Sequence, residues 1–155
     1  MLFNPKNEDR LDRLAYQLRS APALTPELIS NVIADACTHL PVLNRAAVRI
    51  DRLIGAGAWS DAALALIDLE LPAWKLRRLV YEDGEWHCSL SKQLNLPVEL
   101  DETADASHEV LALAILSAFF EARRRTSAAR ETGLPAVPHV RATSDYAVVC
   151  CDNFA

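Results

Sequence analysis

The chain has 155 residues, 51% of them hydrophobic and 24% charged, a composition typical of one globular domain and not of a disordered chain. Its formal net charge is −5, and an acidic domain without a basic block is a poor candidate for nucleic-acid binding. The longest apolar run reaches about half of the ~20 residues that a membrane span needs. The N-terminal residues show no signal-peptide pattern, so we expect a cytoplasmic protein that makes no membrane contact.

Residue usage adds two expectations about origin and redox state. Arginine far outnumbers lysine, and alanine and leucine are abundant, which indicates a GC-rich coding bias and a bacterial source. The four cysteines are too few and too scattered for a disulfide scaffold, so we expect reduced thiols.

Four amphipathic helices are predicted in the first half of the chain. They span about residues 7–20, 25–40, 43–54 and 60–70. The second has the clearest start, because Thr25 is a good N-cap residue and Pro26 suits the first helical position. Pro41 is expected to end or kink this helix, and Gly55 to end the next one.

A β-hairpin follows the four helices. The hydrophobic period changes from 3.6 to two, which predicts strands at about 74–81 and 85–91. Asp83-Gly84 between them is a strong hairpin signal.

The length of the hairpin loop decides which residues share a face. A two-residue loop would separate the apolar residues of the two strands and set Glu82 against Glu85. A three-residue loop, with Gly84 left-handed in a bulge, puts the apolar set on one face, with Arg78 as its one charge. That set is Trp74, Leu76, Val80, Trp86, Cys88 and Leu90. We therefore predict the three-residue loop.

A long helix is predicted over about residues 104–130. Acidic residues precede it and arginines lie near its end, as the helix dipole favours. Its middle, 110–120, is apolar on almost every side, so it is the central core helix, or half core and half dimer interface. Residues 132–145 then form an extended linker, and the apolar tail at 146–151 is a possible third strand.

These elements predict a single α+β domain over residues 1–155, mainly α-helical. About five helices surround the central apolar helix at 104–130, with one small antiparallel hairpin.

Two groups of residues offer reactive chemistry. Cys150 and Cys151 are adjacent thiols, but neighbouring strand residues point to opposite faces, which favours a structural role. Asp105, His108 and Glu109 have helical spacing and could converge on one face. A zinc-protease motif would also need a histidine four positions after His108, where the chain has alanine. No metal site and no cofactor are predicted.

The hairpin surface is the strongest candidate for binding. Two of the three tryptophans lie there, together with Arg77, Leu79, Tyr81 and His87. Tryptophan, tyrosine and arginine dominate the energetics of protein interfaces. We predict these four residues as a binding surface.

The sequence therefore favours a non-enzymatic binding or self-assembly module that forms a homodimer or binds another protein. The alternative is a small enzyme or a metal- or thiol-dependent protein that uses His108 with its acidic neighbours, or the Cys150-Cys151 tail. An enzyme needs several such polar groups within one pocket, whereas a binding module needs an accessible surface.

Overall fold

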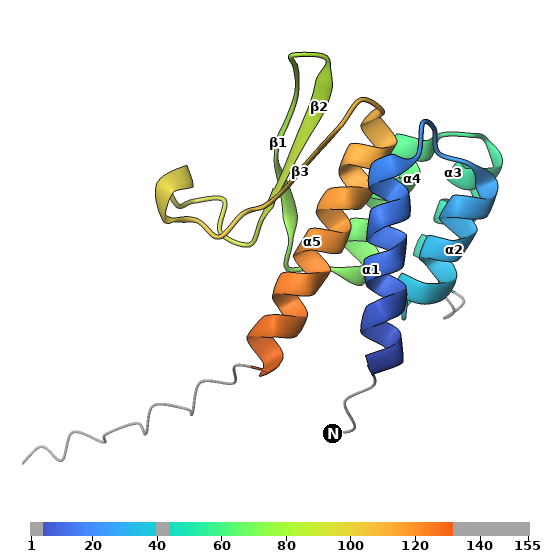
Figure 1. The fold of residues 1–155 in the computed structure, drawn as a ribbon, viewed down its shortest axis with the longest axis horizontal. Helices are drawn as coiled ribbons and strands as arrows, with labels where there is room; N and C mark the ends of the chain where they lie inside the picture. The colour runs from blue at the N-terminus through green and yellow to red at the C-terminus, as the bar shows by residue number, and fades with distance from the viewer. Residues whose placement is uncertain (1–4, 40–43, 132–155) are drawn as a thin grey trace, which may run out of the picture.

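A computed structural model describes residues 5–39 and 44–131 of the chain. Within these residues it has five α-helices, one short 3₁₀ helix and a three-stranded antiparallel sheet, which confirms the predicted mainly helical α+β fold (Figure 1). The elements in chain order are α1 (Pro5–Ser20), α2 (Pro26–Ala36), α3 (Arg45–Gly55), α4 (Trp59–Glu70), β1 (Lys75–Glu82), β2 (Glu85–Ser91), η1 (Val98–Leu100), β3 (Ala104–His108) and α5 (Leu111–Glu131).

Helix α5 is the centre of the fold. The sheet covers one side of it, and α1 and α4 pack on other sides (Figure 1). Leu113, Ile115, Leu116 and Phe119 are fully buried by residues of the same chain. The apolar circumference of this helix is therefore core surface within one copy, and it does not supply the exposed dimer patch that the sequence also allowed.

The starts of α2 and α3 follow local capping rules. Thr25 Oγ1 accepts a hydrogen bond from Leu28 N at 3.2 Å, and Asn44 Oδ1 accepts one from Ala47 N at 2.8 Å. Each bond satisfies a backbone donor that the first turn of a helix leaves without a partner. Pro26 occupies the first helical position, as predicted.

A buried carboxylate ends α2 earlier than predicted. The Glu70 side chain, at the end of α4, is fully shielded from solvent. It accepts hydrogen bonds from Thr38 N at 2.9 Å and His39 N at 2.7 Å, and Arg123 Nη1 lies 3.7 Å from it. Since these donors turn toward Glu70, the helix ends at Ala36 and not near Pro41.

The predicted three-residue hairpin loop is wrong. Tyr81 pairs with Trp86, and Glu82 pairs with Glu85, so the loop is the two residues Asp83-Gly84. Both loop residues have positive φ, 53° and 88°, as a type I′ turn requires. The Tyr81 and Trp86 rings lie 5.2 Å apart, and their contact offsets the repulsion between the two glutamates.

A β-bulge in β1 explains the error. The register shifts between Leu76 and Arg78, so strict alternation does not hold along the whole strand. Leu79, and not Val80, therefore packs against the core opposite Cys88. Arg78 points to the outer face of the sheet, away from α5, and is not the charge on the apolar face that we expected.

The sheet contains a strand that the sequence analysis did not predict. Residues 104–108, predicted as the first turns of the long helix, form β3, and α5 begins at Leu111. Ala104 and Ala106 face α5, and their small side chains allow the strand to lie close to the helix. The predicted linker at 132–145 and the possible strand at 146–151 lie outside the described residues.

The hairpin loop gives a first prediction. Gly84→Val should lower the free energy of unfolding by about 1 kcal/mol or more, because a β-branched residue is strained at positive φ. Asp83→Asn should be nearly neutral, because asparagine readily adopts this conformation. Chemical denaturation of both variants measures the difference, and equal stabilities would contradict the type I′ turn.

Candidate binding site at the edge of the sheet

The two edge strands of the sheet differ in protection. The strand order is β1-β2-β3, so β1 and β3 each have one side without a neighbouring strand. On β1 this side carries a bulge at Arg77 and the exposed charge of Lys75, which are common devices against strand addition. β3 reads Ala-Asp-Ala-Ser-His and pairs with β2 without a register shift, so it has neither a bulge nor a lysine nor a proline. Its protections are its shortness and the exposed charge of Asp105.

The turn geometry shows which backbone groups of β3 are unused. In a hairpin with a two-residue loop, the flanking pair, Glu82 and Glu85, exchanges both backbone hydrogen bonds. Counting from this pair, Glu85, His87 and Ser89 of β2 direct their backbone N–H and C=O groups toward β1. The β3 residues opposite those positions are Ser107 and Asp105. Their N–H and C=O groups therefore point away from β2, to the free edge of β3.

Within the described part of the chain, no segment pairs with these groups. No backbone hydrogen bond outside the sheet and the helices reaches Asp105 or Ser107. An unpaired row of donors and acceptors on a strand is a template for one more strand.

A hollow of about 210 Å³, which we call the edge groove, lies beside this strand edge. Arg19 of α1, Ser107 of β3, and Ser117, Phe120 and Arg124 of α5 are among the residues that line it. The Ser117 hydroxyl is buried and has no hydrogen-bond partner among the residues that the structure describes. The groove therefore combines unused backbone groups, an unused hydroxyl and side chains of both charges, since Asp105 and Glu121 line it together with the two arginines.

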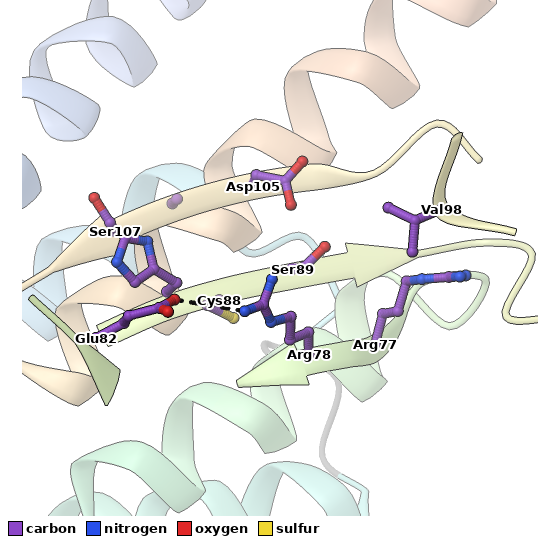
Figure 2. A pocket seen from close by; sticks show the side chains of 10 residues that line it. Arg77, Arg78, Glu82, Cys88, Ser89, Val98, Asp105 and Ser107 are labelled. Atoms are coloured by element: carbon purple, nitrogen blue, oxygen red, sulfur yellow. Dashed lines mark ion pairs between the residues drawn. The ribbon is translucent and has the colours of Figure 1, made fainter. Parts of the chain in front are cut away.

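The outer face of the sheet is polar and open. A hollow of about 500 Å³ lies over it, and Figure 2 shows Arg78 and Glu82 reaching toward each other near Ser89 and Asp105. The Arg78 and Glu82 side chains are both exposed and 3.6 Å apart, so this ion pair contributes little. His87, Ser89 and Ser107 also line this hollow.

The four predicted binding residues do not form one surface. Leu79 and Tyr81 lie on the inner side of the sheet, whereas His87 lines the hollow on the outer side. Arg77 is engaged structurally, since its guanidinium donates to Asp101 Oδ2 at 2.8 Å and to a loop carbonyl. It holds the loop between β2 and β3 against β1.

The residues of the alternative site are also separated. Asp105 and His108 lie on a strand, and their odd spacing directs them to opposite faces. His108 Nδ1 accepts a hydrogen bond from Val110 N at 2.9 Å, immediately before α5. Cys150 and Cys151 lie outside the described residues. Among residues 5–39 and 44–131 no group of three or more potential ligands is placed to hold a metal ion.

Sequence reasoning missed the edge groove because it placed residues 104–108 in a helix. A signal was present, since Ala-Asp-Ala-Ser-His alternates small and polar residues, the period of a half-buried strand. The Ser117 hydroxyl had no such signal, because its burial depends on α1 and β3.

The comparisons with known proteins identify no relative: no family model, no curated protein and no solved structure gave a significant match to the chain. Among the described helices, none has the length and apolar character needed to cross a bilayer.

The buried thiols give a second prediction. Burial raises the pKa of both Cys37 and Cys88 to about 12, with a smaller contribution from the nearby carboxylates Glu70 and Asp105 respectively. Because the thiolate is the reactive form, both should label slowly with a thiol reagent in the native protein up to pH ~9. Peptide mapping by mass spectrometry before and after unfolding measures each site. Rapid native labelling at Cys37 or Cys88 would contradict this assignment.

Proposed function

We propose that this chain is a non-enzymatic binding module that accepts an extended strand of a partner at the free edge of β3. The observation that carries the proposal is the outward row of backbone groups on Asp105 and Ser107, next to the edge groove. Strand addition supplies affinity through main-chain hydrogen bonds and specificity through alternate side chains.

The surroundings of β3 define the chemistry of the incoming strand. Its inward side chains would lie over Ser117 and Phe120 in a groove of about 210 Å³, which favours small residues such as alanine or serine. Its outward side chains would join the polar outer face. Within residues 5–39 and 44–131, the Arg19 side chain donates to a carbonyl of its own helix and to no carboxylate, which favours an acidic group on the partner.

The two buried cysteines bear on the cellular compartment in which the module acts. Cys37 and Cys88 are free and buried, which is the ordinary state of thiols in a reducing cytoplasm, so we place the module there. An enzymatic role gains no comparable support, because the polar residues of the outer face form no hydrogen-bonded nucleophile and base in the described ranges.

A proline substitution tests the proposal. Ser107→Pro removes the outward N–H and places a ring on the free edge, but it breaks no hydrogen bond to β2, so the fold should persist. Ser107→Ala retains the N–H and should weaken binding less. The probe is a short fluorescent peptide in which alanine alternates with threonine, and the measurement is fluorescence polarisation.

The wild-type protein should bind this peptide, and Ser107→Pro should weaken binding by about tenfold or more, the value of one or two net hydrogen bonds. Circular dichroism confirms that both variants are folded. Absence of binding to the wild-type protein, or equal binding to Ser107→Pro, would refute strand addition at β3.

A further inference from the structure

We infer that the strand accepted at the free edge of β3 is β3 of a second copy, paired antiparallel across a two-fold axis through Ala106. The inference rests on the proposed function and names its partner. It gives one continuous sheet in the order β1-β2-β3-β3-β2-β1.

Symmetry and backbone direction leave few registers. A two-fold axis perpendicular to the paired strands repeats each contact with the two copies exchanged. The residue through which the axis passes therefore defines the register. The outward backbone groups belong to Asp105 and Ser107. Hydrogen bonds form only where a residue with outward groups on one copy lies opposite a residue with outward groups on the other copy. The axis can therefore pass through Asp105, Ala106 or Ser107.

Charge selects among the three registers. An axis at Asp105 sets the carboxylate opposite its own copy, and an axis at Ser107 sets Asp105 opposite Glu109 of the second copy. An axis at Ala106 sets Asp105 opposite Ser107 twice, so each carboxylate faces a hydroxyl donor. This register also forms two hydrogen-bonded residue pairs around the axis.

The inner side of the strand permits the same register. Ala106 would meet Ala106 of the second copy, and two methyl groups let the strands approach to ordinary sheet spacing. The edge groove lies directly beside β3, so the two-fold axis sets the groove of one copy opposite that of the other. The buried Ser117 hydroxyl then comes near the second copy, together with the groove charges of both signs, Arg19 and Arg124 with Asp105 and Glu121.

The far edge of the sheet explains why assembly would stop at two copies. The outer strand β1 carries a bulge between Leu76 and Arg78, and bulged, charged edges resist further strand pairing. A two-fold contact uses the same patch on both copies and closes on itself. Since β3 is only five residues long, we expect a dissociation constant in the micromolar range or weaker.

Sedimentation equilibrium over micromolar concentrations tests the dimer. The wild-type protein should show a concentration-dependent equilibrium between 17.1 kDa monomer and dimer. Ser107→Pro should shift this equilibrium to monomer. A wild-type monomer at all concentrations, or a dimer that Ser107→Pro leaves unchanged, would overturn the inference.

A charge exchange tests the register. Ser107→Asp sets two carboxylates opposite each other twice and should weaken the dimer roughly tenfold. Adding Asp105→Lys to Ser107→Asp pairs opposite charges in the Ala106 register and should restore the dissociation constant to within about threefold of the wild-type value. With the axis at Asp105 the same double variant would oppose two lysines, so failure of the rescue overturns the register.

The peptide assay separates the two proposals. A monomeric wild-type protein whose peptide binding is sensitive to Ser107→Pro would overturn the second copy as partner and leave strand addition intact. Peptide binding that ignores Ser107→Pro would overturn strand addition itself.

Discussion

A helix that is apolar on all sides must be covered on all sides, and this requirement organises the whole protein. Leu113, Leu116 and Phe119 of α5 are fully buried, so α1, α4 and the sheet all pack around one helix. Trp74, just before β1, donates from Nε1 to Thr126 Oγ1 of α5 at 3.0 Å. This bond helps to hold the start of the sheet against the same helix.

The need to cover α5 also determines which surfaces of the sheet a partner can reach. One face of the sheet is used to cover α5, so only its outer face and its two edges remain for a partner. The bulge on β1 keeps Leu76 opposite Leu90 and Leu79 opposite Cys88, and of these two residues Leu79 packs against the core. The bulge also makes that edge a poor template. The less protected edge is therefore β3, beside a groove that α5 helps to line.

A buried charge joins the helical half of the protein to this core. Glu70 accepts backbone hydrogen bonds from Thr38 and His39, and Arg123 of α5 lies beside it. A carboxylate without solvent needs such donors, since an unpaired buried charge costs several kcal/mol. Its position at the end of α4 therefore ties the end of α2 to both α4 and α5, and leaves the sheet side free of this network.

The sequence by itself determined the local features: the start of α2 at Thr25, the hairpin around Asp83-Gly84, and α5 as the central helix. Each follows from nearby residues, through capping, turn chemistry or hydrophobic period. Only the tertiary structure decided the strand at 104–108, the register of β1 and hence the candidate site. The short segment Ala104–His108 is a strand because β2 offers it hydrogen-bonding partners, and its small alanines lie close to α5 only once both are in place.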